Sequence, residues 1–168
     1  MARPRLSPLN RPPVWADAYV GLPWDDKGRT REGLDCWGLY RLIKAERFGV
    51  VHPLYEGVVW TPCETRAGQA EANRDLAAYM EGERLKGWTT VWEALGAPPD
   101  EPLGGKLALA GDLVWIRNVG AAIHVGLVAA PGWMLHVEEG IDSVCVPYDG
   151  ADFERRVRGF YRWTGGDR

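Results

Sequence analysis

The sequence predicts an α+β domain in which a helix is followed by an antiparallel sheet. Two observations carry this prediction. Apolar side chains recur at helical spacing after Asp35, and the C-terminal part of the chain consists of short apolar segments separated by turn residues. The helix comes first and the strands follow it, an order that favours an α+β arrangement over an alternating α/β one.

Length and composition are those of one domain with a hydrophobic core, because the chain has 168 residues and a net charge of −3. The mildly acidic balance predicts neither a nucleic-acid partner nor a membrane surface, and no apolar run reaches the ~18 residues of a transmembrane helix. Three scattered cysteines (Cys36, Cys63 and Cys145) argue against a disulfide framework. Without CxxC or paired-histidine spacing, we expect no metal and no other cofactor.

The N-terminal stretch "MARPRLSPLNRPPVW" contains prolines and basic residues but no apolar segment or cleavage-like site. We therefore expect no signal peptide, and residues 1–13 are predicted to form a proline-rich, extended arm. Residues 14–168 are predicted to form a single domain. It opens with a short helical or extended piece that ends at Tyr19, and a polar loop rich in turn residues follows.

The first helix is predicted to begin at Asp35, a good N-cap residue, and to end near Gly49, where a left-handed residue commonly stops a helix. Its apolar stripe consists of Leu39, Leu42, Ile43 and Phe48. Cys36 then lies in the first turn, where unpaired N–H groups and the helix dipole favour a negative charge. This position predicts a thiol pKa below the usual value of about 8.5. A buried structural cysteine is the alternative.

The region from Val50 to about Leu107 is less regular, with a predicted helix in "TRAGQAEANRDLAAYMEGERL". Five predicted strands follow in "GDLVWIR", "AAIHVGLVA", "WMLHVEE", "SVCVP" and "RVRGFYRW". The turn signal "APG" joins the second and third strands into a hairpin. In the last strand, strict alternation predicts a wet face with Arg156, Arg158, Phe160 and Arg162, and a buried face on the other side.

Two histidines, His124 and His136, lie on the two arms of that hairpin. An odd-length loop places them on one sheet face, whereas a two-residue loop separates them unless a bulge intervenes. A buried neutral imidazole beside apolar residues needs a hydrogen-bond partner, and a second histidine supplies one. With Cys36 they form a nucleophile, base and orienting residue. Polar positions on a wet face are the alternative, and His52, before a proline in a loop, is expected to be solvated.

Several sequence blocks occur together in a fixed order: "YVGLPW", "GLDCWGLYRLI", "GDLVWI", "HVGLV" and "MLHV". In this order they resemble the NlpC family of cell-wall cysteine peptidases, over Tyr19 to about Val146. The form "DCWGLYRLI", followed by "FGVVHPLYEG", is most similar to the members found in tailed bacteriophages and gene-transfer particles.

The resemblance implies a papain-like α+β fold, in which the N-terminal helix that carries the nucleophile packs on the sheet. It also implies cleavage of amide bonds in peptidoglycan stem peptides. Cys36 matches the nucleophile, His124 the general base, and His136 the polar residue that orients the base. Tyr19 matches a tyrosine at the edge of the active site that helps to bind the oxyanion. Asp35 matches the aspartate that holds the substrate's amino group in some members.

Two departures from the family pattern stand out. Trp37 follows the nucleophile where most cellular members have serine, so it is expected to alter the substrate-binding subsites. The separation of Cys36 from His124 is also long, which indicates an insertion at about 50–107. Because the cysteine precedes the histidine, circularly permuted acyltransferases fit less well, and CHAP amidases lack the paired "HVGLV…LH" pattern.

The sequence shows neither a wall-binding module nor an export signal, and this favours a peptidase that a phage tail carries to the cell wall to aid genome entry. The expected partners are peptidoglycan stem peptides and other tail-tip proteins. The expected locations are the virion tail tip and, before assembly, the host cytoplasm. A structural or assembly component of the tail tip is the alternative, although a scaffold has no need for Cys36, His124 and His136 together.

Overall fold

A computed structural model describes residues 11–52, 88–90, 107–117 and 124–165. Most of the predicted arm, most of the region at 50–107 with its predicted helix, and Cys63 lie outside these residues. Of the described helices, none has the length and apolar character needed to cross a membrane.

Helix α1 spans Cys36–Phe48 and has the predicted ends. The Asp35 side chain caps it by accepting a hydrogen bond from the Gly38 N–H at 2.6 Å. Gly49 ends it in the left-handed conformation (φ 68°), and its N–H donates to the carbonyl of Lys44. The cap places Cys36 at the first helical position, as the sequence predicts.

A short 3-10 helix, η1 (Val14–Tyr19), and a small hairpin of β1 (Arg29–Thr30) and β2 (Gly33–Leu34) precede α1. The backbone approaches itself closely here, because a Cβ at Gly38 would collide with the carbonyl oxygen of Gly28. The hairpin therefore holds the start of α1 against the preceding chain.

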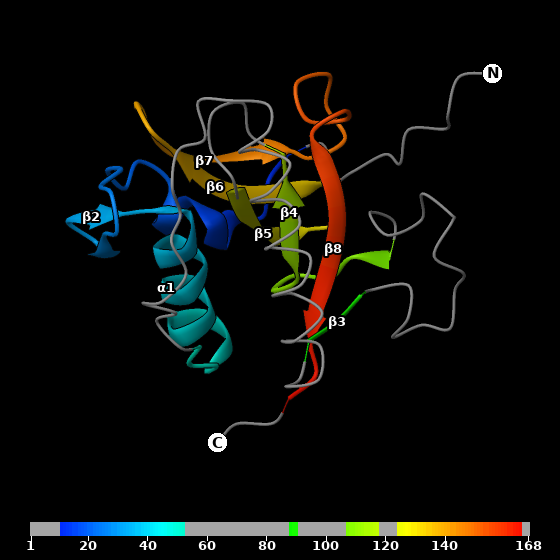
Figure 1. The fold of residues 1–168 in the computed structure, drawn as a ribbon, viewed down its shortest axis with the longest axis horizontal. Coiled ribbons are helices and arrows are strands. Elements are labelled where there is room, and N and C mark those ends of the chain that lie inside the picture. The colour runs from blue at the N-terminus through cyan, green and yellow to red at the C-terminus, as the bar shows by residue number, and fades with distance from the viewer. Residues whose placement is uncertain (1–10, 53–87, 91–106, 118–123, 166–168) are drawn as a thin grey trace, which may run out of the picture.

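The main sheet has six antiparallel strands in the order β3-β8-β4-β5-β6-β7. These strands are β3 (Trp88–Thr90), β4 (Leu113–Ile116), β5 (His124–Ala130), β6 (Trp133–Glu138), β7 (Ile141–Pro147) and β8 (Val157–Trp163). Helix α1 packs beside β5 and β6, with β8 and β3 farther away (Figure 1). The predicted α+β class and the helix-then-sheet order are confirmed.

Both faces of the sheet carry a hydrophobic core. The core on the α1 side includes Leu39, Tyr40, Ile43, Leu113, Val125, Leu127, Ala129, Leu135 and Val137. The core on the opposite side is made of Ala108, Val114, Ile116, Val128, Met134, Tyr148, Phe153 and Phe160. The members alternate along the strands, as expected for a sheet that is packed on both sides.

The predicted wet face of β8 is therefore wrong for Phe160 and Arg162, although Arg158 is exposed. Phe160 is buried in the second core, and Arg162 is half-buried, with its guanidinium bonded to both carboxylate oxygens of Asp112 at 2.9 and 2.8 Å. The alternation of β8 separates two packed faces, because the loop residues around Phe153 cover the side that the sequence pattern left open to water.

Four hydrogen bonds, at two places, tie the outer elements to the sheet. The carbonyl of Gly111, just before β4, accepts hydrogen bonds from the Tyr40 hydroxyl and the Lys44 ammonium of α1, both at 3.3 Å. On β7, the buried Ser143 hydroxyl donates to the Tyr19 carbonyl at 2.6 Å and accepts from the Leu22 N–H at 2.8 Å. These contacts fix α1 and the chain after η1 against the strands.

Candidate active site

The register of the β5–β6 hairpin decides where its two histidines point. Its loop has two residues, Pro131 and Gly132, and Ala130 pairs with Trp133. Before that pair, however, the register shifts, so that Val128 is the partner of Met134. This β-bulge inserts one residue into β5 and restores the parity that a two-residue loop would otherwise lose. As a result, the even-numbered residues of both strands share one face.

His124 and His136 meet on that face. The Nε2 atom of His124 lies 3.1 Å from the Nδ1 atom of His136, and each side chain is about 3% exposed. Gly126 leaves the room for this contact: a Cβ there would lie 3.4 Å from the Cβ of His136 and 3.0 Å from the Leu135 carbonyl oxygen. This hydrogen bond uses Nε2 of His124. The ring nitrogen of His124 that it does not use is therefore Nδ1.

Burial keeps both imidazoles uncharged. It lowers the pKa of His124 well below its usual value, helped by the charges of His136 and Arg156. It also lowers the pKa of His136 to about 4, against the opposing effect of Glu138. Two neutral rings share one proton in their hydrogen bond. When His124 donates that proton from Nε2, its Nδ1 carries a lone pair and can act as a base.

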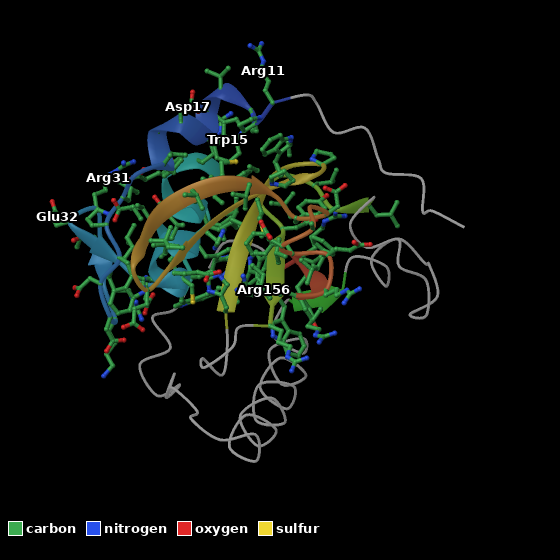
Figure 2. All side chains as sticks on the ribbon, turned by 90° about the horizontal axis from the view of Figure 1, so that it is seen from above. Arg11, Trp15, Asp17, Arg31, Glu32 and Arg156 are labelled. Carbon is green, nitrogen blue, oxygen red and sulfur yellow. The ribbon has the colours of Figure 1, made fainter. Side chains whose placement is uncertain are left out.

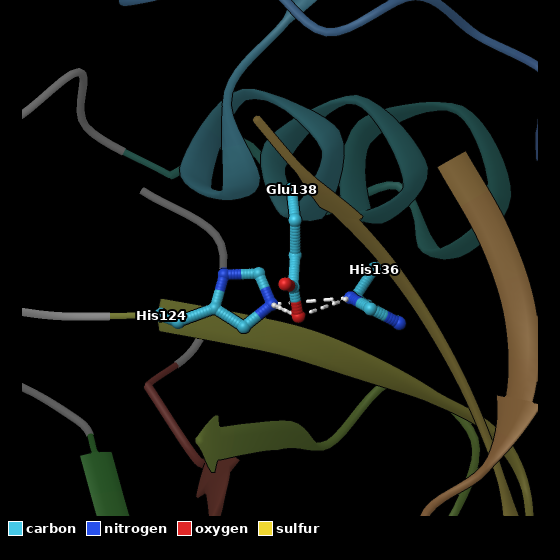
Figure 3. Close-up of side chains that lie close together, drawn as sticks. All are labelled: His124, His136 and Glu138. Carbon is cyan, nitrogen blue, oxygen red and sulfur yellow. Dashed lines mark hydrogen bonds and ion pairs between the residues drawn. The ribbon is translucent and has the colours of Figure 1, made fainter. Parts of the chain in front are cut away.

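Glu138 and Arg156 join this pair, and neither was predicted. Oε1 of Glu138 lies 3.5 Å from Nε2 of His124 and 3.5 Å from Nδ1 of His136, and it accepts a hydrogen bond from Arg156 at 2.8 Å. Figure 3 shows the three side chains converging on one point. The alternation of β6 contained the signal for Glu138, which follows His136 by two residues. No local pattern indicates Arg156.

These side chains include residue types that bind zinc, and within the described part of the chain His124, His136 and Glu138 form the one such group, with donor atoms within 4.8 Å. The charges argue against a cation there. Arg156 already bonds the same carboxylate oxygen, and its positive charge lowers the pKa of both histidines. We therefore assign the group as a hydrogen-bonded network and not as a metal site.

The Cys36 thiol lies at the start of β5. It forms hydrogen bonds with the backbone of Val125, which follows His124 in the chain, and with the backbone of Trp37. Helix α1 packs on β5 through the first core, whereas His136 packs on Phe153 of the second core, with 5.0 Å between the ring centroids. The thiol and His124 thus lie at the same end of β5.

The electrostatics of Cys36 differ from the prediction. Burial raises the pKa of the thiol to about 12, and the charge of Asp35 raises it further. The two backbone hydrogen bonds and the charge of Arg29 lower the pKa, but by less. The predicted lowering by the helix start is therefore outweighed, because the sulfur is enclosed by protein atoms and the residue before it is an anion.

Alkylation measures this difference directly. We expect iodoacetamide to modify Cys36 slowly at pH 6 and increasingly fast as the pH rises above about 9, since the thiolate is the reactive form and burial raises the pKa. Cys145, whose pKa is also raised to about 12 by burial, is the internal comparison. Peptide mapping across pH 6–11 gives both rates. Fast modification of Cys36 at pH 6 would instead show that the helix start lowers the thiol pKa by more than burial raises it.

Asp35 and Trp37 are both engaged in local structure. One oxygen of Asp35 caps α1, and the other pairs with the Arg29 guanidinium at 2.5 Å. Trp37 is 4% exposed and stacks on Tyr40 with ring centroids 5.2 Å apart. The structure brings Asp35 next to the thiol, but it buries the Trp37 side chain against Tyr40 and His52 and not along an open surface.

Tyr19 is not brought to Cys36. Its hydroxyl forms a hydrogen bond with Glu46, which lies about 15 Å farther along α1 than Cys36 at a rise of about 1.5 Å per residue. Arg31 covers the Tyr19 ring at 5.2 Å and pairs with Glu46. Figure 2 shows Arg31 at the hairpin end of the molecule, well separated from Arg156.

The expected solvation of His52 is also wrong. The side chain is 1% exposed and lies among aromatic rings, with centroid distances of 4.8 Å to Trp163 and 5.5 Å to Tyr40. Burial lowers its pKa to about 4. Arg41 of α1 also binds the backbone carbonyl of His52 at 2.7 Å.

Comparison with known proteins gives structural matches only, since neither a family model nor a curated protein sequence matches this chain. A lipoprotein-like NLP/P60 family protein of Staphylococcus aureus matches 90% of the chain at 16% identity and a TM-score of 0.48. The NlpC/p60 domain of the peptidoglycan hydrolase SagA matches 87% of the chain at 17% identity and a TM-score of 0.46. A Bacillus cereus NlpC/P60 family protein matches 89% of the chain at 15% identity and a TM-score of 0.48. The chain spans 39%, 90% and 38% of their lengths, respectively.

Proposed function

We propose that this protein is a cysteine peptidase that hydrolyses amide bonds in peptidoglycan stem peptides. The observation that carries the proposal is the hydrogen bond between His124 and His136 at the strand end where the Cys36 thiol lies. A nucleophile at a helix start, a base and a residue that orients the base are the parts that acyl transfer through a thioester requires. The resemblance of the sequence blocks to those of the NlpC family suggests the substrate class.

In the proposed reaction, the Cys36 sulfur attacks the substrate carbonyl while its proton passes to Nδ1 of His124. Because the thiol pKa is raised, transfer accompanies attack and no standing thiolate is needed. The Cys36 backbone N–H stabilises the oxyanion, as unpaired N–H groups at a helix start can. The protonated His124 gives its proton to the leaving amine, and water, activated by the same ring, then hydrolyses the thioester.

Digestion of purified peptidoglycan by the full chain tests this proposal, with the fragments identified by mass. We expect new amino groups within stem peptides. Release of intact stem peptides from the sugar would favour a CHAP-like amidase, and transfer of an acyl chain without hydrolysis would favour an acyltransferase. No change in the peptidoglycan at any enzyme concentration would reject all three and favour a structural part.

We further propose that the enzyme acts on a phage tail tip, where it opens the wall for genome entry, after a stage in the host cytoplasm. The support is the resemblance of "DCWGLYRLI" and the residues after it to tail-associated members. Other tail-tip proteins are then its partners, contacted by the arm at residues 1–13 and by the insertion at about 50–107. A tail-tip assembly role with the same fold is the alternative.

Deletion of residues 1–13 separates catalysis from assembly. The deleted residues contain four prolines and three arginines and pack no core of their own, whereas η1 begins at Val14. We expect unchanged hydrolysis of soluble peptidoglycan fragments and reduced incorporation into particles. Quantitative immunoblots of purified particles measure the second effect. Normal incorporation of the truncated protein would show that the arm is only a flexible terminus.

A further inference from the structure

The Glu138 carboxylate lies between two histidines and an arginine. One oxygen, Oε1, is 3.5 Å from a ring nitrogen of each histidine and 2.8 Å from Arg156. The Glu138 and Arg156 side chains are 17% and 27% exposed, so water screens their charges only in part. Two opposite charges therefore act on one buried imidazole pair.

Arg156 is held in place on three sides. Besides the bond to Glu138, its Nε donates to the Arg117 carbonyl at 3.0 Å, and its guanidinium lies 4.8 Å from the centre of the Phe153 ring. The same ring packs against His136. This arrangement fixes the distance between the positive charge and the histidines, which a freely rotating surface arginine would not do.

The charges that face the imidazole pair come from two elements. Glu138 on β6 favours the protonated form of His136, and Arg156, just before β8, disfavours the protonated form of both histidines. From α1, the neutral thiol of Cys36 faces β5, and the charges of Asp35 and Arg29 act on that thiol. Within the described residues, the balance of charges on the buried pair thus depends on Glu138 against Arg156.

We propose that Glu138 and Arg156 are positioning residues that act as opposed charges on the His124–His136 pair. Arg156 adds to the effect of burial in keeping the pair neutral in the resting enzyme, so that His124 is available as a base. Glu138 stabilises the positive charge that arises when His124 accepts the thiol proton. The catalytic meaning rests on the proposed peptidase function, whereas the control of the histidine charge state is a property of the resting protein.

Histidine titration by NMR in the full chain tests the proposal without any substrate. The resonances of His124 and His136 are assigned with H124Q and H136Q variants. We expect Arg156→Gln to move the His136 midpoint upward from about 4 by roughly 1–3 pH units, because Glu138 is then uncompensated. Glu138→Gln should move it downward, because only the positive charge remains. The double variant should lie near wild type.

Two neighbouring residues provide matched controls. Glu139→Gln and Arg155→Gln remove the same charges from adjacent, exposed positions, and neither should move the midpoint by more than a few tenths of a unit. Shifts of Glu138→Gln and Arg156→Gln in the same direction, or no larger than those of the controls, would overturn the proposal. If Glu138→Gln does not fold, Arg156→Gln alone tests the proposal: an upward shift of the His136 midpoint supports it, and no shift overturns it.

The pH profile of kcat/KM links the charge pair to catalysis. We expect the acidic limb to move upward in Arg156→Gln, together with the NMR midpoint, and to stay in place in Arg155→Gln. If the histidine midpoints shift as expected but the protein leaves peptidoglycan intact, the proposal on Glu138 and Arg156 would stand and the proposed peptidase function would be rejected. Hydrolysis of peptidoglycan, with histidine midpoints that move in neither variant, would support the peptidase and reject the charge pair.

Discussion

Cys36→Ala should abolish peptidoglycan hydrolysis. Removal of the nucleophile from such a triad costs about 10⁶ in turnover, whereas removal of one oxyanion donor costs only about 10²–10³. The substitution removes one sulfur atom from a half-buried position, and the Asp35 cap and the helix remain. Release of stem-peptide fragments, followed by mass over hours to days, measures the residual rate.

The other described cysteine provides the control. Cys145 is half-buried on β7 and packs against the first core, so Cys145→Ala removes a similar thiol away from the histidine pair. We expect wild-type turnover from it, together with a small loss of stability. If Cys36→Ala and wild type released fragments at equal rates, Cys36 would be a packing residue, and the proposed function would fail with it.

His124→Ala should cost more than His136→Ala. The first substitution removes the base itself, which typically contributes about 10²–10⁴ to the rate. The second removes the partner that fixes the tautomer and orientation of His124 through the 3.1 Å bond, but leaves a base in place. We therefore expect measurable hydrolysis by His136→Ala, rising with pH, and almost none by His124→Ala.

A conservative variant separates orientation from packing. His136→Asn keeps a hydrogen-bonding group on β6 in place of the imidazole, and it should recover part of the rate that His136→Ala loses. Circular dichroism establishes whether each variant keeps its secondary structure. A larger loss in His136→Ala than in His124→Ala, with both folded, would exchange the roles of the two rings.

Much of this site follows from local sequence rules. Asp35 and Gly49 delimit α1 by capping chemistry that acts within a few residues, and the apolar spacing between them fixes which side packs on the sheet. The strands β4 to β8 follow in the same way, whereas β1, β2 and β3 were not predicted. These rules place Cys36 at the helix start and the histidines on paired strands, and the structure has both.

The remainder depends on contacts between distant residues. The bulge before Ala130 decides that His124 and His136 share a face, and the sequence allowed both registers. Glu138 bonds Arg156, which follows it by 18 residues and comes after β7 in the chain. The pKa of Cys36 reverses its predicted direction because burial, which is set by tertiary packing, exceeds the local effect of the helix start.

The burial of every histidine in the chain ties catalysis to the integrity of the fold. His52, His124 and His136 are all buried, and the pKa of each lies well below the roughly 6.5 of an unfolded chain. Below that pH the unfolded chain binds more protons, so the free energy of unfolding falls by up to about 4 kcal/mol per pH unit for three such groups, against a typical total of about 5–15 kcal/mol. Acid that protonates the base therefore also lowers the stability of the fold that holds it.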